Sequence, residues 1–193
     1  MARSREATRK AILDATEALL MLRGAHTLTI DAVAREAKCA KGLVNYHFRT
    51  KGQLLVEVVQ RIAAARQAVW VQAFDSPNPQ DAIDRTWDVL KREVKSGTLR
   101  AWTSLVALAE KDVDQVVNDA SREFRSKITD STERLLARAG MKSSIPAEQL
   151  GWLLAAIVQG MAFQVAAGGD MEVIENAYAA AWHGVLSLAE PID

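Results

Sequence analysis

Hydrophobic residues recur every three or four positions along almost the whole chain, and no stretch alternates β-branched with polar residues. Spacing of this kind lines one face of an α-helix with apolar side chains, so the sequence predicts an all-α protein with about nine helices. The predicted helices cover approximately residues 5–22, 30–37, 41–48, 50–74, 83–96, 99–111, 117–138, 147–167 and 171–185.

Capping residues mark the starts of two of these helices. Thr29 can accept a hydrogen bond from the first turn of the second helix, which also carries Asp31 in that turn. Thr50 and Gln53 have the spacing of a capping box at the start of the fourth helix.

The clearest break in the chain is Ser-Pro-Asn-Pro at residues 76–79, and the charge balance changes sign close to it. The whole chain has 24 Lys and Arg and 24 Asp and Glu, but residues 1–66 have 12 basic and 6 acidic side chains, whereas residues 67–193 have 12 and 18. We therefore predict two domains, 1–66 and 67–193, that share the helix 50–74. A basic module joined to an acidic one is typical of a nucleic-acid or membrane-facing domain attached to a second domain.

The inventory of reactive side chains argues against an enzyme. The single cysteine, Cys39, excludes an internal disulfide, and the three histidines fall in separate predicted elements. No zinc-protease, Walker or serine-hydrolase motif is present, and the acidic stretch 110–114 is not followed by a calcium-loop pattern. We predict no catalytic residue, no metal and no cofactor. The charged opening residues are unlike a secretory signal, so we expect a cytoplasmic protein.

Residues 150–167 carry no charged side chain over about the length that spans a bilayer. Gln159 and Gln164 lie within this segment, glycine and alanine dilute its hydrophobicity, and no basic cluster flanks it. We therefore predict no membrane partner. We expect instead a helix buried on several sides, in the core and a subunit interface at once.

The two short helices 30–37 and 41–48 lie inside the basic segment and are joined by a three-residue turn. A short helix, a tight turn and a second short helix form the layout that places the second helix in the DNA major groove. On that second helix the apolar residues Leu43, Val44 and Phe48 are the predicted buried positions.

The polar residues of this region suit contacts to DNA. Lys41 can donate to guanine, and Asn45 can bond adenine through both the oxygen and the nitrogen of its side-chain amide. The residues suited to phosphate contacts are Thr29, Tyr46, His47 and Lys51. The alternative is that all of them are ordinary solvated residues on a small helical bundle.

Residues 5–65 resemble the N-terminal domain of the tetracycline-repressor (TetR) family. The most specific part of the resemblance is the run G-L-x-x-Y-H-F-x-x-K at residues 42–51, and Gly24 and residues 28–37 also fit. It implies a cytoplasmic homodimer, a palindromic double-stranded DNA operator and a C-terminal domain that binds a small-molecule effector. It also implies which residues meet DNA. Those that face the groove are Ala40, Lys41, Gly42 and Asn45. Those that contact phosphates are Thr29, Tyr46, His47 and Lys51.

The chain departs from the usual family pattern at three positions. Lys38 stands where the turn usually has glycine, Ala40 where a capping serine or threonine is usual, and Asn45 where tyrosine is frequent. Losing the cap costs a helix about 1 kcal/mol.

Five large side chains fall on apolar faces of different helices beyond the break, namely Trp87, Trp102, Phe124, Trp152 and Met161. They either pack in the core or line an apolar pocket between helices, and such a lining would favour a flat or hydrophobic effector. The last helix has a stripe that we predict to form a dimer interface with the uncharged helix, consisting of Tyr178, Ala181, Trp182 and Val185.

From these patterns and the resemblance together we predict a sequence-specific transcription regulator, a repressor released from DNA by a small molecule. The alternative is a ligand-independent or activating DNA-binding regulator. A purely helical interaction module would not predict the charge asymmetry between the two halves.

Overall fold

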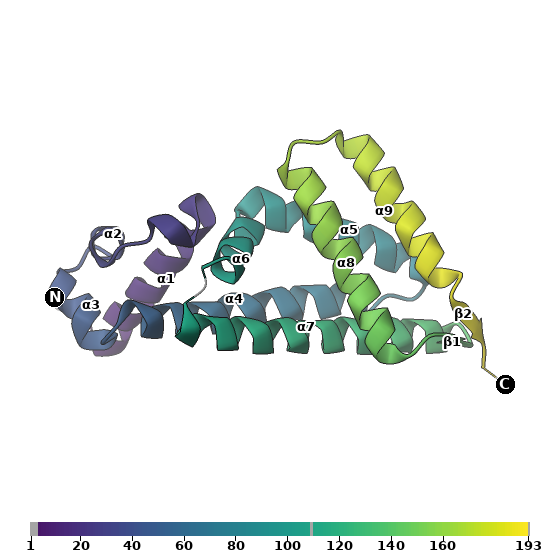
Figure 1. Ribbon diagram of the computed structural model, residues 1–193, viewed down its shortest axis with the longest axis horizontal. Coiled ribbons are helices and arrows are strands. Elements are labelled where there is room, and N and C mark those ends of the chain that lie inside the picture. The colour runs from purple at the N-terminus through teal and green to yellow at the C-terminus, as the bar shows by residue number, and fades with distance from the viewer. Residues whose placement is uncertain (1–3, 109, 193) are drawn as a thin grey trace. The chain divides into compact units, whose positions relative to one another are not determined.

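The computed structural model describes residues 4–108 and 110–192. Within these ranges the chain forms nine α-helices and almost no strand, which confirms the predicted fold class (Figure 1). The helices are α1 (Arg5–Arg23), α2 (Ile30–Glu36), α3 (Lys41–His47), α4 (Lys51–Phe74), α5 (Pro79–Ser96), α6 (Thr98–Val106), α7 (Lys111–Arg138), α8 (Ala147–Ala166) and α9 (Met171–Leu186).

The predicted helix caps are present. The Thr29 hydroxyl accepts from the Ala32 amide at 3.1 Å, and the Thr50 hydroxyl accepts from the Gln53 amide at 3.1 Å. The Gln53 side chain in turn accepts from the backbone amide of Arg49. Local side chains therefore satisfy amides that the first turn of a helix leaves without partners.

Three short elements were not expected from the sequence. A single 3₁₀ turn covers Ala25–Thr27, and two three-residue strands, β1 (Met141–Ser143) and β2 (Ala189–Pro191), pair in an antiparallel sheet. Segments of three residues are too short to show the periodicity on which the sequence predictions depend.

The described chain divides into two compact units by its internal contacts. The N-terminal unit consists of residues up to 64 together with 96–120, and the C-terminal unit of residues 65–95 together with those from 121 onward. The first dividing point lies close to the predicted boundary at residue 66, but α6 and the start of α7 pack with the N-terminal unit. The chain crosses between the units three times, and two of the crossings lie inside α4 and α7.

The core of the N-terminal unit brings together residues from α1 to α4, α6 and α7. Its fully buried members include Ile12, Leu20, Val33, Val44, Leu54, Val58, Leu105 and Val113. On α6, Arg100 donates to the carbonyl oxygens of Met21 and Leu22, and Ser104 accepts from the Ala25 amide at 2.9 Å. The polar side chains of α6 therefore satisfy backbone groups at the end of α1 that its own hydrogen bonds cannot reach.

Ion pairs join α1 to α4 in the same unit. Arg61 pairs with Asp14 at 2.7 Å and with Glu17 at 3.4 Å, and Arg9 pairs with Glu57. Hydrogen bonds from Lys10 and Arg61 lower the pKa of the Asp14 carboxyl below its ordinary value of 3.8. These groups are partly exposed, so they orient the two helices more than they stabilise them.

The C-terminal unit has a charged group at its centre. The Arg66 guanidinium on α4 donates to both oxygens of Glu93 on α5, at 2.8 and 2.9 Å, and lies over the Phe124 ring. The indole of Trp70 donates to the same carboxylate at 3.1 Å. Buried charges are stable only when paired in this way, so the network fixes the position of α4 against α5.

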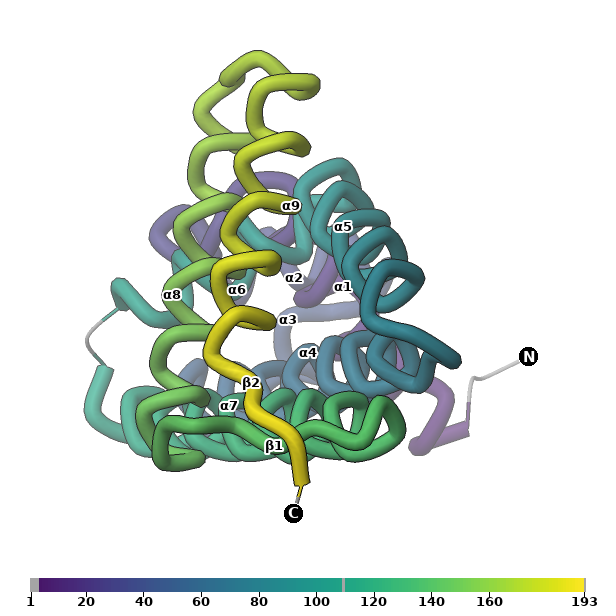
Figure 2. The backbone as a smooth tube through the Cα atoms, turned by 90° about the vertical axis from the view of Figure 1, so that its right-hand side faces the viewer, coloured from purple at the N-terminus to yellow at the C-terminus, as the bar shows by residue number. Residues whose placement is uncertain are grey.

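Two antiparallel helices, α8 and α9, lie side by side in this unit (Figure 2). Gly151 allows α8 to approach α7, because a Cβ atom there would lie 2.6 Å from the Thr129 hydroxyl. Asp170 caps the start of α9, because its carboxylate accepts hydrogen bonds from the amides of Glu172 and Val173.

The closest backbone approach in the N-terminal unit predicts the effect of one substitution. Gly97 has a φ of +84°, and a Cβ atom there would lie 2.2 Å from the Met21 carbonyl oxygen. Gly97→Ala should lower the free energy of unfolding by more than about 2 kcal/mol, since it adds a backbone clash to a left-handed conformation. Urea unfolding followed by tryptophan fluorescence measures this.

Gly140→Ala is the matched control, because Gly140 has a φ of +71° but open space around its Cβ position. It should lose only the conformational term of about 1 kcal/mol. Equal losses for the two variants would contradict the close approach of α6 to α1.

Candidate nucleic-acid interface

The two helices α2 and α3 are held in place by a few apolar anchors. Val33 and Ala34 bury the inner side of α2, and Val44 with Phe48 does the same for α3. Each helix has only seven residues, too few to be stable alone, so both depend on this burial.

The outward side of α3 brings together most of the residues predicted to contact DNA. Ala40, Lys41, Gly42, Asn45 and Tyr46 are all exposed, and Tyr46 is 64% exposed although it is aromatic. His47 and Lys51 are half-buried, and Thr29 is exposed at the start of α2.

One residue on this helix does not have its predicted environment. Leu43 was expected on the buried side, but it is 43% exposed, whereas Val44 and Phe48 are buried as predicted. In a helix as short as α3 only one narrow stripe faces the core, so the third apolar residue lies at its edge. An exposed leucine beside Lys41 and Asn45 adds an apolar contact to a polar surface.

Gly42 has no packing reason to be glycine. Nothing lies within 4 Å of the position that its Cβ would occupy, and its backbone is helical. Glycine near the start of a short helix costs about 1 kcal/mol relative to alanine. Packing within the subunit does not offset this loss of helix stability. A partner that approaches the backbone closely would offset it, because such an approach requires a residue without a side chain.

The two departures in the turn have a visible structural cost. Lys38 has a φ of +52°, the left-handed region that the glycine usual in the family adopts freely. Ala40 is the N-cap of α3 and, having no polar side chain, makes no capping hydrogen bond.

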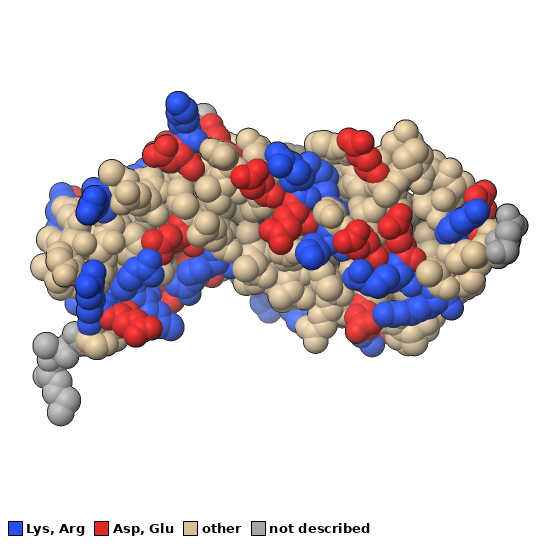
Figure 3. Space-filling view, turned by 90° about the horizontal axis from the view of Figure 1, so that it is seen from below, with Lys and Arg blue, Asp and Glu red and all other residues tan. Residues whose placement is uncertain are grey.

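Acidic residues pair with two of the basic residues of the surface. Lys41 on α3 pairs with Asp31 on α2 at 2.9 Å, and Lys51 lies 3.7 Å from Glu110. Both partners of the first pair are more than half exposed, so it is worth at most about 1 kcal/mol and can be exchanged for another anion. On the face drawn in Figure 3, blue basic side chains outnumber red acidic ones at the left end, which belongs to the N-terminal unit.

Arg5 is a further basic residue that the sequence did not single out. Its guanidinium lies over the Tyr46 ring, 5.5 Å from the ring centre. No local pattern connects residues so distant in the chain, and only the packing of α1 against α3 brings them together.

The predicted pocket residues do not form one group. Trp102 belongs to the core of the N-terminal unit, whereas Trp87 is buried in the C-terminal unit. Trp152 is 57% exposed and stacks with Arg125, whose guanidinium lies 4.0 Å from the ring centre. Phe124 and Met161 are half-buried. Helical periodicity identified the apolar faces but not the partner that each one meets.

The predicted dimer stripe is also revised. Tyr178, Trp182 and Val185 are 1%, 3% and 3% exposed, so they face the core of their own subunit, and Ala181 is half-buried beside them. The exposed apolar side chains of this region lie elsewhere, on α8 (Trp152, Phe163) and on α9 (Val173).

The helix α8 is less buried than the sequence suggested. By length and composition Ala147–Ala166 could cross a membrane, and within the described subunit only 33% of its apolar window is buried. Its inner side, which includes Leu150, Leu154 and Val158, packs in the core, and its outer side is exposed and carries no charged residue after Glu148.

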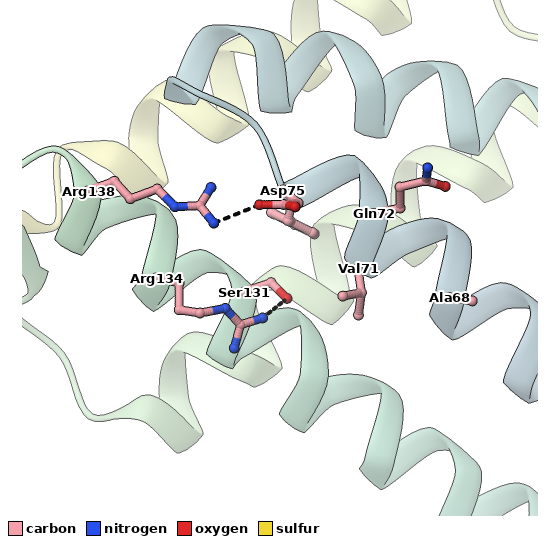
Figure 4. Close-up of a pocket in the computed structure, with 8 residues that line it drawn as sticks. Ala68, Val71, Gln72, Asp75, Ser131, Arg134 and Arg138 are labelled. Atoms are coloured by element: carbon pink, nitrogen blue, oxygen red, sulfur yellow. Dashed lines mark hydrogen bonds and ion pairs between the residues drawn. The ribbon is translucent and has the colours of Figure 1, made fainter.

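An open groove of about 400 Å³ lies on the C-terminal unit, and Figure 4 shows its lining from α4 and α7. Arg138 reaches Asp75 at 2.7 Å and the Ser76 carbonyl, and Arg134 donates to Ser131 at 2.9 Å. Both guanidinium groups are therefore already engaged by the protein.

A sequence model of the bacterial regulatory proteins of the tetR family matches residues 12–58, from α1 through α2 and α3 into α4. Residues 12–58 therefore match the N-terminal domain of that family. The resemblance inferred from the run at residues 42–51 is thereby confirmed.

Two curated HTH-type transcription regulators are similar to part of this chain. It is 33% identical over 85 residues to the HTH-type transcriptional regulator SrpR of Pseudomonas putida, and 30% identical over 81 residues to the HTH-type transcriptional repressor BepR of Brucella suis biovar 1. The matches span 44% and 41% of this chain, and only 37% and 39% of those relatives. Both are named as regulators and neither as an enzyme.

Solved TetR-family structures match over almost the whole chain. A regulator from Agrobacterium tumefaciens superposes with a TM-score of 0.78 at 14% identity, covering 94% of this chain and 99% of its own. Reduced NemR of E. coli gives a TM-score of 0.75 at 19% identity, covering 95% and 98%. At such identities the likeness concerns the fold, including that of the C-terminal unit.

The left-handed turn residue gives a prediction that does not depend on DNA. Lys38→Gly should raise the free energy of unfolding by about 0.5–1 kcal/mol, since the strain at φ +52° is larger than the entropic cost of glycine. Thermal unfolding measures it. Lys127→Gly, within the exposed face of α7, is the control and should lower stability by about 1 kcal/mol. A loss at both positions would contradict the strain assigned to Lys38.

Proposed function

We propose that this protein is a transcription regulator that binds a palindromic operator as a homodimer and is released from it by a small molecule. The observation that carries the DNA-binding part is the outward side of α3, where Lys41, Gly42 and Asn45 are exposed together. The helix that presents them is short and fixed by its buried side, as a base-reading helix must be.

Base recognition falls to three kinds of contact on α3. Lys41 donates to guanine once it leaves Asp31, and Asn45 bonds the edge of adenine. The exposed Leu43 suits the methyl group of thymine. The open space at Gly42 lets the groove edge approach the helix backbone.

Phosphate contacts fix the orientation of the helix on the duplex. We assign them to Thr29, Tyr46, His47 and Lys51, which flank α3 and lie at or near the surface. Such contacts supply affinity without sequence information and make binding sensitive to salt.

Dimerisation through the outer sides of α8 and α9 would complete the DNA-binding unit. Phe163 is 69% exposed on α8, which has no charged residue after Glu148, and exposed small residues on α9 (Ala177, Ala180, Gly184) allow close approach of another helix. A second copy seated there would form a four-helix bundle with two-fold symmetry, which matches a palindromic operator. It would also cover the apolar surface without a membrane, in keeping with a cytoplasmic protein whose partner is DNA.

Release from DNA would be transmitted through helices common to both units. α4 and α7 are each continuous from one unit into the other. A ligand that favours one position of α4 in the C-terminal unit therefore changes the position of the residues that back α3. A coupling of about 1–3 kcal/mol would change operator affinity roughly 5- to 150-fold.

Selection from a random DNA pool by the purified chain should enrich a palindrome. On that operator, Lys41→Ala and Asn45→Ala should each cost about 1–3 kcal/mol of binding free energy while changing affinity for random DNA little. Lys51→Ala should weaken both and lower the slope of log affinity against log salt by about one. Lys127→Ala, an exposed lysine on α7, is the control and should change none of these. Failure to enrich any palindrome would count against the proposal.

Phe163→Glu should convert a dimer into a monomer, because it places a charge on the face assigned to the partner. Sedimentation or light scattering at micromolar concentration measures this. Leu22→Glu, at another exposed leucine in the N-terminal unit, should leave the dimer intact. A monomeric wild-type chain would refute this part of the proposal and leave DNA reading by α3 to be judged separately.

A further inference from the structure

An ion pair joins α2 to α3 on the surface to which the DNA contacts are assigned. The Lys41 ammonium donates to the Asp31 carboxylate at 2.9 Å, and the two side chains are 57% and 63% exposed. Lys41 is the first residue of α3, and Asp31 lies two residues after Thr29. The carboxylate therefore lies beside one residue assigned to a phosphate and another assigned to a base.

A carboxylate in this place opposes DNA binding unless it makes a contact of its own. The phosphates of a duplex repel it, and its exposed pair with Lys41 adds little to the stability of the fold. The base groups of the major groove that can donate to it are the amino groups of cytosine and adenine. Asp31 is thus suited to one of these two amino groups.

The spacing of the ion pair matches two atoms of one base pair. In G·C, guanine O6 and cytosine N4 are hydrogen-bonded to one another, so they lie about 2.9 Å apart. The Nζ atom of Lys41 and the Oδ2 atom of Asp31 are likewise 2.9 Å apart. Because O6 accepts and N4 donates, an ammonium facing O6 and a carboxylate facing N4 each meet a group of opposite polarity.

Guanine suits Lys41 better than thymine does. A T·A pair also sets an acceptor, thymine O4, beside a donor, adenine N6. Guanine offers two acceptors in the groove, O6 and N7, whereas thymine offers one and carries a methyl group beside it. An ammonium group on the thymine side would lose part of its hydration against that methyl group, so the ion pair favours G·C.

Recognition of the two bases is coupled through the ion pair. When the Lys41 ammonium turns from Asp31 to guanine, the carboxylate loses its cation close to the phosphates. The amino group of the cytosine in the same base pair replaces that donor. A charge that docking removes from water is costly without a partner, so Lys41 binds guanine most tightly where Asp31 meets cytosine.

We propose that Asp31 is a specificity-determining residue, and that Asp31 and Lys41 together read one G·C base pair in each half of the operator. Lys41 binds the guanine, and Asp31 accepts from the cytosine. This inference rests on the DNA binding proposed above and deepens it, because it names the base pair and its orientation.

Inverting this base pair tests the assignment. Its position is the one at which Lys41→Ala relaxes the base preference of the selected operator, and duplexes with G·C, C·G, T·A or A·T there in both halves are compared. Inversion to C·G sets the cytosine amino group opposite the ammonium and guanine O6 opposite the carboxylate. The wild-type chain should therefore bind the G·C duplex about 5- to 150-fold more tightly than the C·G duplex, as measured by fluorescence anisotropy of labelled DNA.

Two variants assign the preference to the ion pair. Asp31→Ala should reduce the preference for G·C over C·G by about 5-fold or more, and should bind random DNA at least as tightly as the wild type, since it removes a negative charge. The reciprocal exchange, Asp31→Lys with Lys41→Asp, should reverse the preference, because donor and acceptor change places. Both side chains are more than half exposed, so neither variant disturbs the core.

Glu36→Gln is the matched control. Glu36 is also an exposed acidic residue of α2, but it lies at the other end of that helix. Its substitution should leave the relative affinities for the four duplexes unchanged.

The outcomes separate this inference from the proposed function. Equal binding of the G·C and C·G duplexes, T·A binding as tight as G·C binding, or no relaxed position in Lys41→Ala overturns the inference, while an enriched palindrome still supports the function. A gain in affinity by the same factor for every duplex in Asp31→Ala shows that Asp31 only neutralises Lys41, and overturns it too. Failure to enrich any palindrome refutes the function and the inference with it. Reversal of the preference by the reciprocal exchange supports both.

Discussion

The seven residues of α3 do not form a stable helix by themselves, and the proposed recognition of DNA depends on how they are held. Val44 and Phe48 are the anchors, and the core that receives them is assembled from segments as distant as α1, α4 and α6. Because the anchors occupy one narrow stripe, the remaining side chains are free to face a partner. The missing cap at Ala40 and the strained Lys38 lower the intrinsic stability of this region. Nearly all of the stability of α3 therefore comes from burial of its anchors in the core.

A second constraint acts in the C-terminal unit, where Arg66 and Glu93 are buried together. A buried charge that loses its partner is costly, so the pair tolerates little relative movement of α4 and α5. Trp70 shares the same carboxylate, and Phe124 covers the guanidinium.

The sequence was sufficient to predict features that depend on neighbours along the chain. The caps at Thr29 and Thr50 need residues only three or four positions away, and the exposed polar face of α3 follows from its helical period. Features that depend on which helices meet were not predictable. Tyr178 and Trp182 were expected at a subunit surface and Trp102 in the C-terminal domain, because an apolar stripe looks the same whether it faces its own core or a partner. The contact between the rings of Phe74 and Trp182 likewise exists only after α4 and α9 have packed.

The return of α6 to the N-terminal unit has a consequence for how such proteins can diversify. The DNA-reading unit is not encoded by one continuous stretch, since Trp102, Leu105 and Val113 complete its core from beyond residue 95. Recombination that joined residues 1–64 to an unrelated C-terminal half would leave the end of α1 and one side of that core uncovered. A viable exchange must therefore import an equivalent of α6 with its close glycine contact. New properties of the C-terminal unit are then expected to arise by substitution within an inherited framework more readily than by shuffling of whole domains.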